Sequence, residues 1–461
     1  MERENAWKKY DDTAEVYDFA EGYRQFISQN KTERECAAYF EGKAKAAGFK
    51  DLKEVIKAAV PIRPGDKLYA VNKAKEVALF VIGKKPLCEG MRILGAHIDS
   101  PRLDLKQNPL YEDTDMALLD THYYGGVKKY QWVTLPLALH GVVAKKDGEV
   151  IKVSVGDEPG DPVFGVSDLL IHLSQEQLEK KGAKVVEGED LNVLVGSIPA
   201  SKKEKEEAKE LVKANIVNIL QEKYNIEEED FLSAEIEVVP AGEARDYGFD
   251  RSMIMGYGHD DRVCAYPSYE AIAAMSKVDY TSVCLLVDKE EIGSVGATGM
   301  HSSFFTDMVA ELCALEGNDS AVYLRRVLSN SKVLSSDVSA AYDPNYPSVM
   351  EKKNSAYFGR GVVYNKYTGS RGKSGSNDAN AEYVAWIRKV MDDSDVSFQT
   401  AELGKVDAGG GGTIAYILGN LNMQVIDSGV AVLNMHAPWE IISKVDLYEA
   451  FKAYKAFLIA E

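Results

Sequence analysis

The chain has 461 residues, 45% of them hydrophobic, and can therefore bury a large core in two domains or in one domain with a large insertion. A formal net charge of −18 at pH 7 disfavours nucleic acid and anionic membranes as partners, because both attract basic surfaces. No signal-peptide-like stretch and no run of about 18 apolar residues is present, so we expect a cytoplasmic protein. The five cysteines are scattered without a C-x-x-C pair, which indicates reduced thiols.

The first hundred residues predict helices followed by strands. Apolar residues at helical spacing predict a helix over 13–30, and the T-x-x-E capping box of Thr32 and Glu35 predicts the start of a second. The apolar runs 76–83 and 91–100 predict strands. The second run ends in polar residues that apolar packing does not explain.

Residues 101–245 predict an inserted β-rich domain. The segment 134–156 alternates like a β-hairpin with Asp147 and Gly148 at its turn, and a charged amphipathic helix is predicted over 201–224. Strands and helices alternate again over 246–461, as in an α/β sandwich. We therefore expect one α/β domain, built from 1–100 and 246–461, that is split by the insertion.

Several polar residues follow predicted strands or begin a helix. His97 and Asp99 end one strand, Asp337 and His436 follow two others, and Asp260 lies at a loop-to-helix junction. Each alone has an ordinary structural alternative: a polar strand end, a helix cap or a packed core histidine. The neighbouring Asp261 has the same alternative, a cap at the helix N-terminus.

Taken together, these positions favour a centre for two metals. Sites in open α/β sheets lie beyond the carboxyl ends of strands, which brings five candidate ligands together. They are His97, Asp260, Glu291, Asp337 and His436. Nitrogen and oxygen donors without thiolate fit two divalent ions per chain, with zinc expected and cobalt or manganese as alternatives. The adjacent Glu290 would remain free as the general base that takes a proton from metal-activated water.

The motifs "GAHIDSPRLDLK", "HDDRVCAY", "DKEEIGSVGATG", "SSDVSAAYDPNY" and "NMHAPWE" occur along almost the whole chain. In this order they resemble the aspartyl aminopeptidase family of cytosolic dinuclear zinc aminopeptidases, which are related to the tetrahedral aminopeptidases. The resemblance implies that His97, Asp260 and Asp337 hold one metal. It assigns Asp260, Glu291 and His436 to the other metal. Glu290 would act as general base and then acid, while Asp99 orients His97.

The resemblance also implies an assembly. The catalytic domain would be a zinc-peptidase α/β sandwich, and the insertion would be a dimerisation domain in a tetrahedral homo-dodecamer. His140 resembles a histidine of the insertion that reaches a neighbouring subunit's site and stabilises the tetrahedral intermediate. A buried barrel histidine is the structural alternative for His140.

Two loops bear on the substrate. The glycine-rich segment 406–418 lacks the Lys-Ser/Thr ending of a P-loop, so we reject a nucleotide site and expect its backbone N–H groups near substrate oxygens. Family members that prefer acidic N-terminal residues use a basic group near the segment 364–378, where Lys366 and Arg371 are candidates. A solvated loop is the alternative for Arg371 and Lys373.

The expected function is hydrolysis of N-terminal residues, with Asp or Glu as one preference, from peptide substrates. A broad-specificity aminopeptidase, or a hydrolase of another amide on the same scaffold, is the second hypothesis. The third is a self-assembling, peptide-binding shell without catalysis. Glu290 beside all five candidate ligands argues against the third, because such a shell has no need of a free base.

Overall fold

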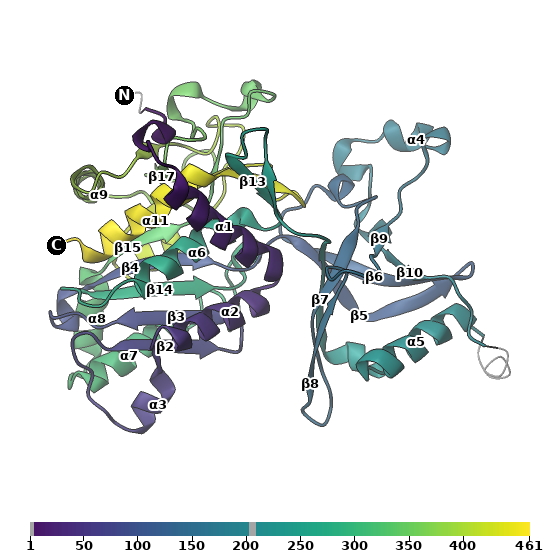
Figure 1. Ribbon diagram of the computed structural model, residues 1–461, viewed down its shortest axis with the longest axis horizontal. Coiled ribbons are helices and arrows are strands. Elements are labelled where there is room, and N and C mark those ends of the chain that lie inside the picture. Colours follow the sequence, from purple (N-terminus) through teal and green to yellow (C-terminus); the bar gives the residue numbers. More distant parts are fainter. Residues whose placement is uncertain (1–3, 202–208) are drawn as a thin grey trace. The chain divides into compact units, whose positions relative to one another are not determined.

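The computed structural model describes residues 4–201 and 209–461 and divides into two compact units. The first unit comprises Met1–Ser100, Ala244–Met435 and Glu440–Glu461, and the second comprises Pro101–Glu243 and His436–Trp439. In Figure 1 the second unit is the blue-to-teal part that carries β5 to β11, which interrupts the first unit in sequence.

A nine-stranded mixed sheet forms the centre of the first unit. Its strands, in spatial order, are β1 (Lys50–Asp51), β2 (Lys67–Asn72), β3 (Glu76–Val81), β14 (Thr281–Val287), β4 (Met91–His97), β15 (Lys332–Ser336), β19 (Gln424–Gly429), β17 (Val362–Asn365) and β18 (Phe398–Thr400). Strand β4 runs parallel to β14 and to β15, so the carboxyl ends of these three strands meet at one edge of the sheet.

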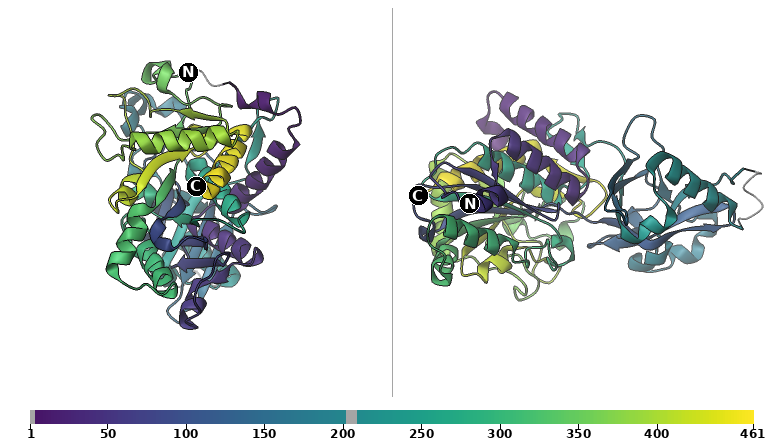
Figure 2. Two further views of the ribbon diagram at one scale, coloured as in Figure 1. Left: turned by 90° about the vertical axis from the view of Figure 1, so that its left-hand side faces the viewer. Right: turned by 90° about the horizontal axis from the view of Figure 1, so that it is seen from below.

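Helices cover both faces of this sheet, as the views in Figure 2 show. One face packs against α1 (Ala14–Gln29), α2 (Glu33–Ala46), α6 (His259–Ala273), α9 (Ala381–Asp393) and α11 (Lys444–Ile459). The other packs against α3 (Leu52–Lys57), α7 (Phe304–Leu315), α8 (Ala321–Asn330) and α10 (Ala415–Gly419). Successive residues of β4 alternate between the two cores: Leu94 joins the first and Ile93 the second. The predicted α/β sandwich is confirmed.

A smaller five-stranded sheet completes the first unit. Its order is β12 (Arg245–Tyr247), β13 (Met253–Gly256), β21 (Glu440–Ser443), β20 (Ala431–Leu433) and β16 (Ser339–Ala340). The predicted capping box of α2 is also confirmed, since Glu35 N donates to Thr32 Oγ1 over 3.2 Å and Thr32 N donates to the Glu35 carboxylate over 3.3 Å.

The second unit is an antiparallel seven-stranded sheet. Its order is β8 (Val150–Val155), β7 (Leu137–Ala144), β11 (Ala234–Pro240), β5 (Arg102–Asp113), β6 (Met116–Tyr124), β10 (Val193–Gly196) and β9 (Gly165–Val166), with the helices α4 (Gln175–Leu178) and α5 (Leu211–Tyr224). The predicted hairpin is confirmed as β7 and β8. The predicted helix over 201–224 is observed as α5, and its part at 202–208 lies outside the described residues. The dimerisation role of this unit stays a prediction.

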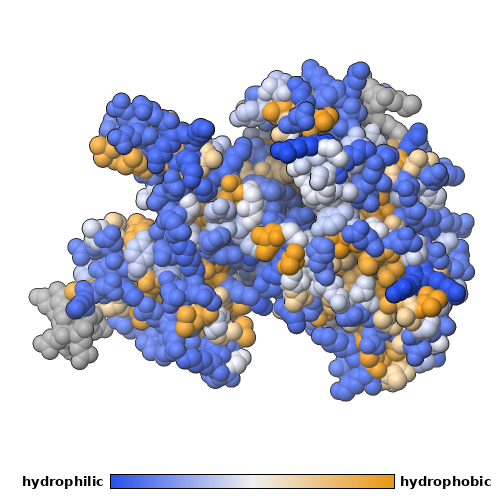
Figure 3. Space-filling view, turned by 180° about the vertical axis from the view of Figure 1, so that it is seen from behind, coloured by the Kyte–Doolittle hydropathy of each residue, from blue (hydrophilic) through white to orange (hydrophobic). Residues whose placement is uncertain are grey.

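The surface is mostly hydrophilic in the view of Figure 3, with scattered apolar patches. Apolar side chains are exposed in the part of the second unit that carries α4, including Leu170, Ile171 and Leu173 at 53%, 69% and 69%. Among residues 4–201 and 209–461, no helix is both long and apolar enough to span a bilayer.

Candidate metal centre

His97 is the last residue of β4 and is 1% exposed. Its Nδ1 lies 3.0 Å from the backbone oxygen of Asp99, a contact in which the ring N–H donates to the carbonyl. This hydrogen bond places the lone pair of the neutral ring on Nε2, which lies 3.1 Å from Asp260 Oδ1. The end of β4 therefore directs an imidazole nitrogen at a carboxylate oxygen, as two ligands of one metal would be arranged.

The backbone holds Asp260 on both sides. Its N–H donates to the carboxylate of Glu440 over 3.0 Å, and its carbonyl accepts from the hydroxyl of Ser100 over 2.7 Å. Asp260 and Asp261 are joined by a cis peptide bond and have non-helical backbone angles at the start of α6. The side chain of Asp260 is thus presented from a fixed junction between loop and helix, where sequence reasoning had placed it.

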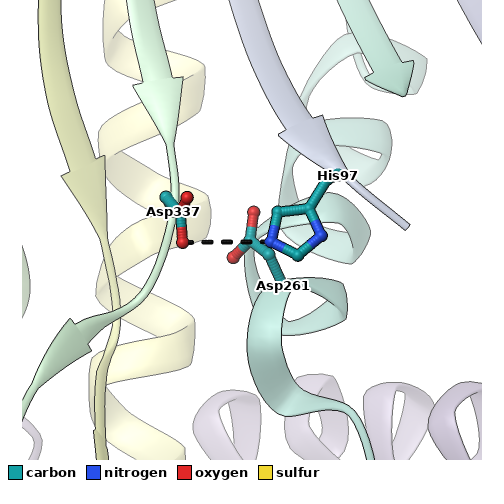
Figure 4. A group of neighbouring side chains, drawn as sticks. All are labelled: His97, Asp261 and Asp337. Atoms are coloured by element: carbon teal, nitrogen blue, oxygen red, sulfur yellow. Dashed lines mark ion pairs between the residues drawn. The ribbon is translucent and has the colours of Figure 1, made fainter. Parts of the chain in front are cut away.

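Asp261 and Asp337 lie around the same imidazole, as Figure 4 shows. One donor atom from each of His97, Asp261 and Asp337 falls within 4.8 Å of the others. Asp337 Oδ1 is 4.0 Å from His97 Nε2. Asp261 is fully buried and has non-helical backbone angles at the start of α6, so the helix-cap alternative for Asp261 stays a prediction.

The adjacent glutamates lie in the short 3-10 helix Glu290–Ile292 that follows β14. The backbone N–H groups of Glu290 and Glu291 each donate to one carboxylate oxygen of Asp99, both over 3.2 Å. Asp99 Oδ1 also lies 3.2 Å from His97 Nδ1. One buried aspartate therefore fixes the positions of the histidine and of both glutamates. Its predicted contact with His97 is one of three contacts that it makes here.

The two glutamates also approach His97 itself. Donor atoms of His97, Glu290 and Glu291 all lie within 4.8 Å of one another, and Glu290 Oε2 is 3.9 Å from His97 Nε2. The first unit thus brings together all four of its predicted ligands and the predicted base.

The electrostatics of the cluster favour a bound cation. Burial opposes protonation of His97, but its hydrogen bonds with Asp260 and Asp99 and the charges of Asp99 and Asp337 raise its pKa well above the usual value. Burial and the negative charges of Asp260 and Asp261 raise the pKa of Asp337 well above its usual range. Both shifts arise because several carboxylates lie close together in a buried site. A bound cation would stabilise their charged forms.

The donor set fits zinc. Two ligands of one tetrahedral zinc lie roughly 3.4 Å apart, because each bond is about 2.1 Å long. Nε2 of His97 lies 3.1 Å from an oxygen of Asp260 and 4.0 Å from an oxygen of Asp337, on either side of this separation. The cluster consists of nitrogen and oxygen donors, the type that zinc, cobalt and manganese accept.

Sequence reasoning missed Asp427, a buried carboxylate on β19. Its Oδ1 accepts from the hydroxyl of Thr413 over 2.6 Å, directly after the glycine-rich turn 409–412. Burial raises the pKa of Asp427 to about 7, and the charge of Glu290 adds to the rise. Asp427 pairs with Ser335 of β15, two residues before Asp337. This pairing brings Asp427 near the site, and it follows from the strand order rather than from any local sequence pattern.

Two predicted histidines belong to the second unit. His436 Nδ1 lies 2.9 Å from the carbonyl of Gly126, so its ring presents Nε2 as a lone-pair donor in the same way as His97. His140 in β7 is 3% exposed, and its Nε2 lies 2.8 Å from the carboxylate of Asp157. The burial of His140 and its contact with Asp157 are also what the structural alternative, a buried barrel histidine, would show. Metal ligation by His436 and catalysis by His140 stay predictions.

Comparison with known proteins identifies the family to which this chain belongs. The family model described as Aminopeptidase I zinc metalloprotease (M18) matches residues 26–458. The chain belongs to the M18 family. The expected resemblance is confirmed, and the protein is a zinc-dependent aminopeptidase, a hydrolase that removes residues from peptide N-termini.

Relatives of this M18 chain match over its full length. A probable M18 family aminopeptidase 1 from Clostridium acetobutylicum is 61% identical over 459 residues, covering 99% of this chain and 98% of that protein. The crystal structure of aminopeptidase I from the same organism has a TM-score of 0.92 at 61% identity and 99% coverage of both chains. An M18 aminopeptidase from Thermotoga maritima has a TM-score of 0.95 at 44% identity, with 100% of both chains covered.

Proposed function

We propose that this M18 aminopeptidase hydrolyses peptides by means of two divalent metal ions. Most of the residues that would hold these ions belong to its first unit. His97, Asp260 and Asp337 would hold one ion, and Asp260, Glu291 and His436 the other. Bound in this way, the pair of ions supplies Lewis acidity and lowers the pKa of water towards 7. The observation that carries the proposal is that two groups of possible ligands share His97 at the end of β4: one contains Asp337 and the other contains both glutamates.

Glu290 is the proton carrier in this proposal. Its backbone is fixed by Asp99 at 3.2 Å, while its side chain remains 15% exposed and can meet a water and a substrate amine. A carboxylate in this position takes a proton from the attacking water and returns it to the leaving amine. Glu291, anchored through the same carboxylate of Asp99, serves as a ligand instead.

The segment 364–378 contains the basic residues that are candidates for binding an acidic N-terminal side chain of the substrate. Asp378 binds both Lys366 and Lys373, the latter over 2.9 Å, and these lysines lower the pKa of Asp378. Both lysines are therefore held by one carboxylate, whose single charge balances that of one ammonium group. Arg371 lines a cavity of about 320 Å³ with the turn at Gly404 and Gly409. We infer that Arg371 is the cation that would meet an acidic N-terminal side chain.

Activity on a panel of aminoacyl chromogenic substrates tests this specificity. The parent enzyme should prefer Glu and Asp over Gln and Leu, and Arg371→Ala should reduce the Glu-to-Gln ratio by about tenfold, as expected for loss of one charged contact of 1–2 kcal/mol. Lys405→Ala, in the same cavity, is the matched control because its ammonium group binds the carbonyl of Ser348 over 2.7 Å. A parent that cleaves Leu as fast as Glu would instead identify a broad-specificity aminopeptidase.

We also propose a cytoplasmic homo-oligomer, with a tetrahedral dodecamer as its form. A structural neighbour with 20% identity and a TM-score of 0.76 is the S. cerevisiae mApe1 dodecamer. The exposed apolar residues Leu170, Ile171 and Leu173 of the second unit supply surface that a neighbouring copy could cover. Mass measured by light scattering tests the number of copies.

The shared-site hypothesis for His140 predicts complementation between subunits. His140→Ala should lower turnover by about 10²–10³-fold, because one oxyanion donor is lost. Co-assembly of His140→Ala with Glu290→Gln should then restore part of the activity, because some sites would receive both intact residues. Mixed assemblies, verified by mass, provide the measurement.

His172→Ala is the matched control, since His172 is the exposed histidine beside Leu173 in the same unit. If His140→Ala only destabilises the fold, His140 is a packed residue that pairs with Asp157. If His172→Ala, and not His140→Ala, complements Glu290→Gln, the histidine shared between subunits is His172.

A further inference from the structure

A second cavity of the first unit concentrates positive charge. It measures about 880 Å³ and lies at the edge strand β18. Four of its lining residues are the cations Lys352, Lys353, Arg360 and Arg388, and none of the described lining residues is an aspartate or glutamate. In a chain with a net charge of −18, this is a local reversal of the overall charge.

Aromatic stacking holds part of this charge in place. The rings of Tyr342 and Tyr357 stack with centroids 5.4 Å apart, Lys352 Nζ lies 5.7 Å from the first ring and the Arg360 guanidinium 5.9 Å from the second. The Tyr357 hydroxyl donates to the carbonyl of Lys352 over 2.9 Å. The cations on this side of the cavity are therefore positioned by a built scaffold.

The acidic residues closest in sequence are engaged by uncharged donors. The Glu351 carboxylate accepts from Lys353 N over 3.2 Å and from Asn354 Nδ2 over 2.6 Å. The Glu402 carboxylate accepts from the Tyr367 hydroxyl over 2.5 Å. Glu351 is thus held within its own loop, and Glu402 is held by the loop that carries Tyr367.

The cavity borders an edge of the main sheet. Strand β18 is the last in the order and pairs with β17 on its inner side. The Gln399 amide accepts from Tyr357 N over 2.9 Å and donates to Tyr357 O over 2.8 Å, which ties the cationic segment to this strand. The same segment continues along β18, since Glu402 N just beyond the strand donates to Asn354 O over 2.6 Å.

We propose that this cavity binds an acidic segment of another protein. The carboxylates of this segment would meet Lys352, Lys353 and Arg388, which line the cavity. None of the lining residues is a candidate metal ligand, and β18 lies three strands from β15 in the sheet. The site is therefore a docking site beyond the proposed hydrolysis.

The test uses the full-length enzyme and a fluorescent hexaglutamate peptide, N-acetylated so that the aminopeptidase cannot degrade it. We expect binding that weakens as salt rises from 0.05 to 0.5 M, with no comparable binding of acetylated hexaglutamine. Lys352→Glu and Arg388→Glu should each weaken binding by about three- to tenfold, since an attraction becomes a repulsion. Turnover of small aminoacyl substrates should stay unchanged in both variants.

Lys389→Glu is the matched control. Lys389 is the neighbour of Arg388 on α9, pairs with Asp393 and does not line the cavity, so its reversal should change binding less than twofold. Equal loss in Lys389→Glu, or equal binding of hexaglutamine, would overturn the proposal. Competition by inorganic phosphate at matched ionic strength would replace it with a small-anion site. A change of oligomer mass in Arg388→Glu would replace it with an interface between copies.

Discussion

Replacing Glu290 by glutamine should lower turnover by about 10²–10⁴-fold while leaving the metal content nearly unchanged. Glutamine keeps the size of the side chain but cannot take a proton from water. The backbone anchor on Asp99 is a main-chain contact and survives the substitution. Initial rates on a saturating aminoacyl substrate, together with elemental analysis of the same preparation, provide the measurement.

Glu291→Gln is the matched control, because both glutamates are held by Asp99 at the same distance of 3.2 Å. This variant should lose metal as well as activity, and added zinc should restore part of the turnover. If Glu290→Gln stays within a few-fold of the parent, another group moves the proton. If both variants lose metal equally, the division into base and ligand fails.

Features with local causes were predictable from the sequence. The capping box at Thr32 and the hairpin of β7 and β8 depend on residues within a few positions of one another, so the pattern alone determines them. The meeting of His97 and Asp337 depends on strand ends that converge, which the alternation of strands and helices already indicated.

Features with long-range causes were not predictable in the same way. Asp261, for which a helix cap is the structural alternative, is a fully buried carboxylate grouped with His97 and Asp337 at the non-helical start of α6. The double anchor from Asp99 to the backbones of Glu290 and Glu291 joins positions 191 and 192 residues apart, and no local pattern records it. The position of Asp427 depends on the pairing of β19 with β15, which joins strands far apart in the sequence.

Asp260→Ala should disturb both metals of each chain and lower turnover by about 10³-fold or more. The magnitude follows from loss of Lewis-acid stabilisation worth several kcal/mol, at 1.36 kcal/mol for each tenfold change in rate. Asp260 is the residue that the two proposed ligand sets share, whereas His97 and His436 belong to one set each. His97→Ala should therefore weaken mainly one site. Zinc per chain, measured by elemental analysis at graded free zinc, distinguishes these patterns.

Asp261→Asn is the sharpest control for the bridge, since Asp261 is adjacent in sequence, fully buried and grouped with His97 and Asp337. Its amide preserves the shape of the side chain and removes the charge. If Asp260 is the bridge, Asp261→Asn should retain two zinc ions at concentrations where Asp260→Ala retains neither firmly. Undisturbed double occupancy in Asp260→Ala would refute the bridge. If Asp261→Asn loses metal instead, Asp261 is the ligand, because the His97 imidazole has both carboxylates within reach.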